Sequence, residues 1–168
     1  MYNKECLCIW TLLFTIYDFE RLIIDMKRTA LREHVFRILF RFDFFDKSDF
    51  EEQINLYFDE YPDLSDYPEV EDYPVISDMD RAEIESRVND LAAHLDEIDE
   101  KISTHCQGWT IDRIAKAELA IIRLACYEIF YDEDVDKAVA INEAVELSKK
   151  YASDKSPSFV NGVLSKVQ

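Results

Sequence analysis

Glycine is nearly absent from this sequence: Gly108 and Gly162 are the only two among 168 residues. Few glycines mean few tight turns, which disfavours β-sandwiches and barrels and favours helices joined by short connections. The same scarcity excludes a glycine-rich phosphate loop and a dinucleotide-binding fingerprint. With 48% hydrophobic and 13% aromatic residues, the chain is expected to form one globular, all-α domain.

Cysteine is also scarce and is not arranged for disulfides or for metal. The four cysteines are Cys6, Cys8, Cys106 and Cys126, without the paired spacing of a disulfide framework. Reduced thiols in a cytosol fit best, so we expect a cytoplasmic protein. A zinc site needs a second Cys or His pair at ligand spacing, and His105-Cys106 has none. We therefore expect neither a metal nor a cofactor.

Motifs for catalysis are missing as well. The three histidines, His34, His94 and His105, stand in no recognisable hydrolase arrangement. The Glu-x-x-His motif of di-iron bundles is absent, because leucine or isoleucine stands three residues before each histidine. The many carboxylates are expected on outward helix faces and in a loop, not as a desolvated acid–base pair. We therefore assign no catalytic residue, and binding is the function that remains.

The formal charge of −17 is concentrated in the middle of the chain. Residues 46–100 hold twenty acidic and three basic residues, so the remainder sums to zero. Within that remainder, residues 27–41 have a net charge of +4. An acidic surface repels phosphate, so any nucleic acid would be expected to contact only the basic end. The acidic middle is interpreted as a solvated face that keeps the protein soluble.

Apolar residues recur at helical spacing along most of the chain, which predicts six or seven helices and no strand. The segment 117–131 is apolar nearly all round and is expected to be the central helix of the core. The expected helices are residues 29–45, a second opened by a capping box at Ser48–Glu51, one long helix over 80–106, 117–131, one ending near Tyr151, and 158–167 with Ser156 as its N-cap.

The first 25 residues are treated as an extension of the domain over 26–168. Their apolar run, residues 6–17, is too short to span a bilayer comfortably and lacks the features of a signal peptide. Three interpretations stay open: an extra helix, a weak membrane-contacting segment, or upstream sequence translated from a misassigned start. Met26-Lys27-Arg28 looks like a natural beginning and favours the third. No membrane association is expected of the domain.

A hexapeptide of the form Tyr-Pro-x-apolar-x-Asp occurs three times over residues 61–78. Proline in each copy breaks helix and favours extended chain, which predicts an exposed acidic loop. Peptide docking is one interpretation, and simple repeat expansion is the favoured one.

Several motifs together resemble one known family. Residues 138–150 (AVAINEAVELSKK), 159–164 (FVNGVL) and 120–128 (AIIRLACYE) resemble three signature segments of the NusB family, in the family's order. Arg32-Glu33 and Leu39-Phe40 match its first helix. The resemblance covers about residues 26–168. We expect Asn142, Glu143, Asn161 and Gly162 to be architectural, the asparagines as buried ties and the glycine at a close backbone approach.

The resemblance implies a fold of two small helical bundles packed across each other. It implies a transcription antitermination factor that binds the boxA element of nascent ribosomal RNA transcripts and is required for their synthesis. It also implies a heterodimer with NusE, a small-subunit ribosomal protein, and assembly on RNA polymerase. By position, the implied RNA-binding residues are Lys27, Arg28, Arg32, Arg123 and Phe159, and the implied partner-binding residues are Phe40 and Glu118.

The chain departs from the family at two places that bear on function. Thr29 and Leu31 interrupt the usual arginine cluster, which predicts fewer phosphate contacts and a shallower salt dependence. Asp136 replaces the proline usual before the helix over 138–150. One alternative remains beside antitermination, an acidic helical adaptor with little RNA affinity. An RNA methyltransferase is strongly disfavoured, because it would need a long C-terminal catalytic domain.

Overall fold

The computed structural model describes residues 27–60, 76–105 and 110–167, and within them it contains seven α-helices and no strand. The helices are α2 (Arg28–Phe42), α3 (Phe50–Glu60), α4 (Asp78–Ala93), α5 (Leu95–His105), α6 (Lys116–Tyr131), α7 (Lys137–Tyr151) and α8 (Ser156–Leu164). Two short 3₁₀ helices, η1 (Lys47–Asp49) and η3 (Ile111–Arg113), precede α3 and α6. The predicted extension over 1–25, most of the Tyr-Pro repeat, Cys106 and Gly108 lie outside the described residues.

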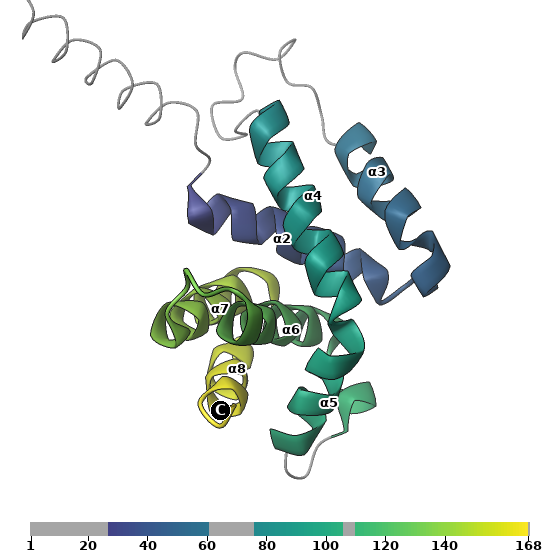
Figure 1. Ribbon diagram of the computed structural model, residues 1–168. Helices are drawn as coiled ribbons and strands as arrows, with labels where there is room; N and C mark the ends of the chain where they lie inside the picture. The colour runs from purple at the N-terminus through teal and green to yellow at the C-terminus, as the bar shows by residue number, and fades with distance from the viewer. Residues whose placement is uncertain (1–26, 61–75, 106–109, 168) are drawn as a thin grey trace, which may run out of the picture.

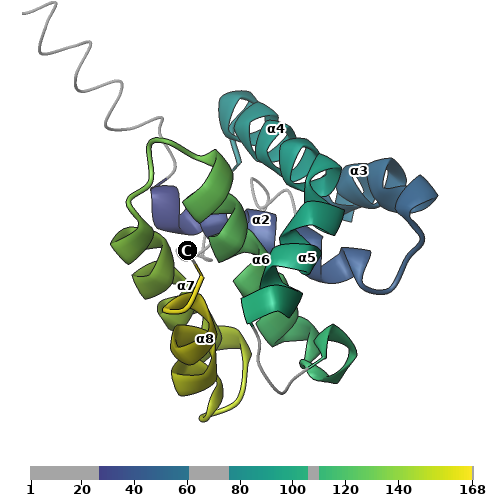
Figure 2. The same cartoon turned by 60° about the horizontal axis from the view of Figure 1, so that its bottom comes forward.

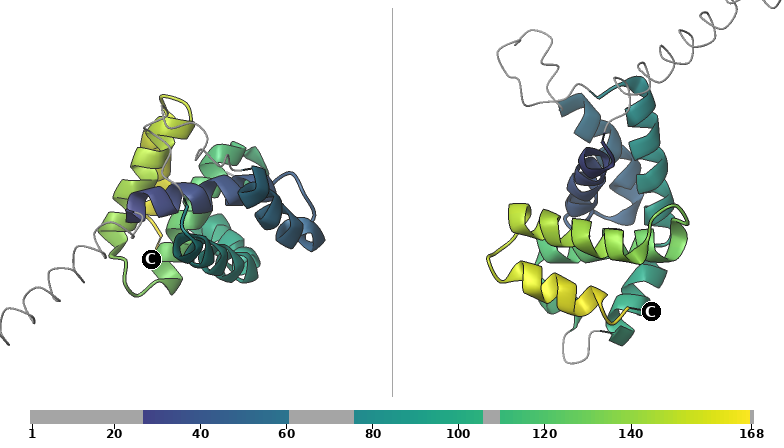
Figure 3. Two further views of the ribbon diagram at one scale, coloured as in Figure 1. Left: turned by 90° about the horizontal axis from the view of Figure 1, so that it is seen from above. Right: turned by 90° about the vertical axis from the view of Figure 1, so that its left-hand side faces the viewer.

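The helices form two bundles that cross through α2 and α6. Helix α2 packs against α3 and α4, with α4 crossing in front of it in Figure 1. Helix α6 packs against α5, α7 and α8, and it occupies the middle of this second group in Figure 2. Helices α7 and α8 lie side by side in the right-hand view of Figure 3. Contacts between α2 and α6 join the groups, which confirms the predicted fold.

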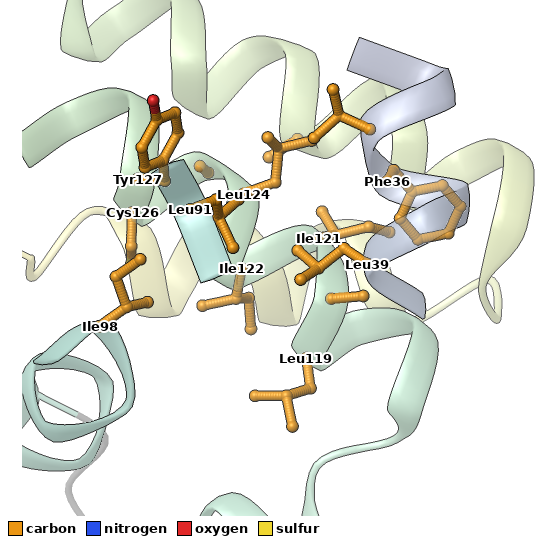
Figure 4. Packing of buried hydrophobic residues seen from close by; sticks show 14 of the residues in the cluster. Phe36, Leu39, Leu91, Ile98, Leu119, Ile121, Ile122, Leu124, Cys126 and Tyr127 are labelled. Carbon is orange, nitrogen blue, oxygen red and sulfur yellow. The ribbon is translucent and has the colours of Figure 1, made fainter. Parts of the chain in front are cut away.

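Helix α6 is the centre of the core, as its sequence predicts. Ten consecutive residues, from Leu119 to Glu128, are buried. Figure 4 shows their side chains meeting Phe36 and Leu39 of α2, Leu91 of α4 and Ile98 of α5. An apolar surface on every side lets one helix contact both bundles, and the burial of each large side chain stabilises the fold by roughly 1.5–3 kcal/mol.

The single long helix predicted over residues 80–106 is wrong, because the chain bends at His94. The backbone of His94 has φ −97° and ψ 4°, which ends α4, and α5 begins at Leu95. The apolar seam itself is buried as expected, but its first half packs on α2 and its second half on α6. A straight helix could not follow both partners, so tertiary packing overrides the continuous helical pattern.

Two helix starts also differ from the prediction. Ser48 lies in η1 and its hydroxyl donates to Asp49, so it opens no capping box. The capping box is at α4, where the Ser77 side chain accepts from the Asp80 amide at 3.1 Å and the Asp80 carboxylate accepts from the Ser77 amide at 3.3 Å. Ser156 is the first residue of α8 and not its N-cap; its hydroxyl donates to Glu118 of α6 at 2.5 Å.

Candidate nucleic-acid interface

The basic segment identified in the sequence runs along α2, and the structure divides its five cations into two groups. Arg41 pairs with Glu60 at 2.8 Å, and Arg37 pairs with Glu33 at 2.5 Å while donating to the Tyr151 hydroxyl. Arg32 is buried in ion pairs of its own. Each of these three cations therefore already has a carboxylate partner within the protein, although only Arg32 is buried.

Lys27 and Arg28 form the second group. Both are exposed at the start of α2, where Lys27 is the N-cap and the first turn carries no acidic residue. Among the described residues, no carboxylate lies within ion-pair distance of either side chain. The free amide groups and the dipole of a helix start add positive potential at the same place. As far as the described residues go, the beginning of α2 is thus an uncompensated cationic end.

Arg32 lies one turn further along the helix, with 7% of its side chain exposed. Its Nε donates to Glu128 Oε1 of α6 at 2.6 Å, and its Nη1 lies 3.6 Å from Glu143 Oε2 of α7. Burial raises the pKa of the Glu128 carboxyl, and the charge of Arg32 and its hydrogen bond oppose that rise. Arg32 therefore ties α2 to both α6 and α7.

Arg123 is held in a second buried network at the other end of α2. It donates from Nε and Nη2 to the two carboxylate oxygens of Asp99 at 2.7 Å each, and from Nη1 to Asp43 at 2.9 Å. Burial alone would lower the pKa of Arg123, but its bonds and charge interactions with Asp99 and Asp43 raise it. Since Asp43 is the C-cap residue of α2, fifteen positions after Arg28, Arg123 lies roughly 20 Å from the cationic end.

The remaining predicted site residues have partly exposed side chains. Phe159 of α8 packs against the edge of the core. Phe40 contacts the rings of Phe36 and Phe44, and Glu118 lies in the first turn of α6. That turn is beside the end of α2, because Lys116 lies 3.5 Å from Asp43. The structure thus brings Phe40 and Glu118 to one end of α2 and Lys27, Arg28 and Arg32 to the other. Phe159 lies near the first of these ends, because Ser156, one turn before it on α8, donates to Glu118.

The carboxylates that hold the two arginines were not identified from the sequence as their partners. Glu128 stands alone among apolar residues of α6, and Asp43 stands within a run of phenylalanines. In both cases, a single charged residue surrounded by apolar ones was the sequence feature that could have indicated a buried ion-pair partner. Glu143 is architectural as expected, because it faces Arg32.

The expectation for the other three architectural residues was wrong. Asn142 and Asn161 are exposed, so neither ties helices from within. Gly162 is also exposed, and apart from the backbone of its own helix nothing lies within 4 Å of the place its Cβ would occupy. No close backbone approach therefore explains this glycine.

Within the described ranges, no cluster of three or more His, Cys, Asp or Glu side chains is arranged to hold a metal ion. No helix in these ranges is both long and apolar enough to cross a membrane.

Fold and charge together define a class: an all-helical protein of two crossed bundles that presents a cationic helix end on an acidic molecule. The NusB family model matches residues 29–168. Transcription antitermination protein NusB of Agathobacter rectalis is 43% identical over 141 residues, 84% of this chain and 98% of the relative. The corresponding protein of Bacillus subtilis is 48% identical over 84 residues, half of this chain and 64% of the relative.

Solved structures agree with the sequence comparison. NusB of T. maritima superposes with a TM-score of 0.70 at 26% identity, covering 86% of this chain and 92% of that one. A chain from the crystal structure of antitermination factors NusB and NusE in complex with dsRNA gives 0.62 at 25% identity, covering 84% and 97%. The chain belongs to the NusB family of transcription antitermination proteins.

Proposed function

We propose that this protein is a transcription antitermination factor that binds the boxA element of nascent ribosomal RNA transcripts at the start of α2. It acts together with the NusE ribosomal protein on RNA polymerase and is required for transcription of ribosomal RNA genes. The observation that carries the proposal is the pair Lys27 and Arg28, the two cations of the basic segment without a described carboxylate partner. A solved relative in complex with NusE and dsRNA supports it.

Direct RNA contact is assigned to Lys27 and Arg28. Long cationic side chains at a helix start reach phosphate oxygens. Contact of Arg32, Arg123 and Phe159 with RNA stays a prediction. Both guanidinium groups are buried and bonded to carboxylates, and Phe159 lies one turn after Ser156, which donates to Glu118 at the other end of α2. RNA stays away from the outer face of α4 and α5, whose exposed carboxylates are Asp78, Glu83, Asp90, Asp96, Glu97 and Glu100.

The NusE face is assigned to the opposite end of α2. Phe40 and Glu118 lie there, and the neighbouring Phe44 and Phe45 are 60% and 46% exposed. Exposed aromatic side chains are enriched at the centres of protein interfaces, where they supply much of the binding energy. One helix would then present RNA-binding cations at its start and partner-binding rings at its end.

The domain over residues 26–168 carries this function without catalysis. Its role is to bind RNA and protein, and none of its described side chains forms a metal cluster that would supply chemistry. A factor that acts on nascent transcripts works where RNA polymerase works, so we assign it to the cytoplasm.

The test is a titration of the full chain against boxA RNA and against a scrambled RNA of the same composition, with and without the ribosomal protein. We expect preference for boxA, tighter binding with the partner, and clear weakening by Lys27→Ala with Arg28→Ala. Lys47→Ala is the matched control, because Lys47 is an exposed cation beyond the other end of α2. Equal affinity for both RNAs in every combination would refute the proposal and favour an acidic protein-binding adaptor.

A further inference from the structure

The guanidinium of Arg32 fills a closed site between three helices. Apolar side chains of α6 and α7 surround it, chiefly Ile121, Leu124, Ala140 and Leu147, and they leave no room for a water molecule. Glu128 is 2% exposed and Glu143 19% exposed, so both carboxylates face inward. Nothing in this geometry lets the head group of Arg32 reach a phosphate on the surface while its ion pairs are intact.

The position of Arg32 on α2 gives this buried site a consequence at the surface. Arg28 precedes Arg32 by four residues, so the two side chains leave the same face of the helix one turn apart. Fixing the second turn on α6 and α7 therefore fixes the direction in which the first turn presents its cations. Lys27 lacks a side-chain cap, so the first turn has no side-chain support from its own N-cap.

We propose that Arg32 is a positioning residue for RNA binding: by pairing with Glu128 and Glu143, it holds the start of α2 so that Lys27 and Arg28 face the RNA. The inference rests on the proposed function and deepens it. It distinguishes the cations that contact phosphate, Lys27 and Arg28, from the cation that orients them, Arg32. Removal of either partner loosens the start of α2 and leaves the number of phosphate contacts unchanged.

The test uses Glu128→Gln, because the two roles of Arg32 predict opposite signs. If Arg32 is a positioning residue, the variant binds boxA RNA more weakly, by threefold or more. If Arg32 is an RNA contact restrained by Glu128, the variant releases it, and binding becomes tighter and steeper in salt. Glu146→Gln is the matched control, since Glu146 lies on α7, pairs with Lys149 and does not touch Arg32. Tighter binding of Glu128→Gln than of Glu146→Gln would overturn the inference.

The salt dependence of binding gives a second, independent readout. Each phosphate contact contributes roughly 0.7 to the logarithmic salt slope for single-stranded RNA. Arg28→Ala should lower the slope by about that amount, whereas Arg32→Gln should weaken binding at an unchanged slope. Arg32→Lys keeps the charge but loses the planar fork, so it should also weaken binding. Wild-type affinity for Arg32→Lys together with a reduced slope for Arg32→Gln would show a direct contact.

Amide hydrogen exchange separates failure of this inference from failure of the proposed function, because it needs no RNA. In Glu128→Gln, exchange at residues 31–35 should accelerate at least about tenfold relative to α8. Unchanged exchange there overturns the positioning role whether or not RNA binds. If no form of the chain binds boxA RNA, the proposed function fails, and the exchange result still decides what Arg32 does to α2.

Discussion

The two ends of α2 are fastened to α6 by ion pairs of opposite polarity. At the start, α2 supplies the cation, Arg32, and α6 supplies the carboxylate of Glu128. Just past the end, the α2 side supplies the carboxylate of Asp43, and α6 supplies the guanidinium of Arg123. A reversed helix would place like charges together, and a shift by one turn would separate Arg32 from Glu128 and Asp43 from Arg123, so this pattern specifies one crossing of α2 on α6.

The two ends of α2 differ in the side chains that remain exposed after these ion pairs have formed. The start of α2 leaves Lys27 and Arg28 in solvent, whereas the end leaves Phe44 and Phe45. Cations suit phosphate, and aromatic rings suit a protein surface. The buried charges therefore set the architecture, and the exposed side chains carry the two proposed binding functions.

Arg123→Ala is expected to have the largest effect on stability. It leaves Asp43 and Asp99 without their cation, and one oxygen of Asp43 already lies buried without a hydrogen-bond partner among the described residues. Loss of a buried partner costs about 3–5 kcal/mol in the free energy of unfolding. Urea denaturation measures it, with Lys149→Ala as the exposed-pair control at about 1 kcal/mol or less. Equal losses in the two variants would contradict the structural role given to Arg123.

The middle of α2 should make stability depend on pH. Burial lowers the pKa of His34 from 6.5 to about 4, helped by the nearby Arg37 and opposed by Glu33 and Asp80. Between those values the unfolded chain binds a proton that the folded chain does not, so His34 favours folding at neutral pH and this contribution is lost as pH falls from 6.5 towards 4.

The loss attributable to His34 is up to about 3 kcal/mol. Glu128 works in the opposite sense, because its raised pKa makes its contribution fall as pH rises above 4.5. Urea unfolding across pH 4.5–7.5 measures the sum, and His34→Gln should flatten the curve between pH 5 and 6.5. A variant curve parallel to the wild-type curve would rule out His34 as the source.

Phe44→Ala should weaken binding at the end of α2 without affecting binding at its start, and its effect on stability should be small. Phe44 is 60% exposed, so the free energy of unfolding should change by no more than about 0.5 kcal/mol. Affinity for the ribosomal protein should fall about tenfold or more, as for an aromatic interface anchor. RNA binding measured without the partner should stay unchanged. Unaltered partner affinity, measured by calorimetry, would remove this end from the proposed interface.

A chain that begins at Met26 should show the smallest effect of all. The family model matches from residue 29, and among the described residues the core begins at Leu31. Its unfolding free energy and its affinity for boxA RNA should equal those of the full chain. Aggregation of the shortened chain would mean that the leading segment belongs to the core.

The sequence alone predicts the parts of the fold that depend on local pattern. The bounds of α6 and α7 follow from their apolar periodicity, and the two-bundle fold follows from motifs in residues 120–164. The bend at His94 could not be predicted, because the apolar spacing runs through it unbroken and only packing against two partners requires it. The capping box at Ser77 was hidden inside the Tyr-Pro repeat.

The functional site was less predictable than the fold for a physical reason. Arg32 and Glu128 are 96 residues apart, and no periodic pattern indicates which carboxylate a given arginine will meet. The sequence correctly concentrates positive charge on α2, but only the fold shows that three of its five cations are already paired.

The most direct test of the two-ended account is chemical-shift mapping of the labelled protein, first with boxA RNA and then with the ribosomal protein. RNA should shift the amides of residues 27–31, with none shifted along α5. The ribosomal protein should then shift residues 40–45 and the first turn of α6. RNA-induced shifts centred on Phe44 and Phe45, with none at Arg28, would contradict it.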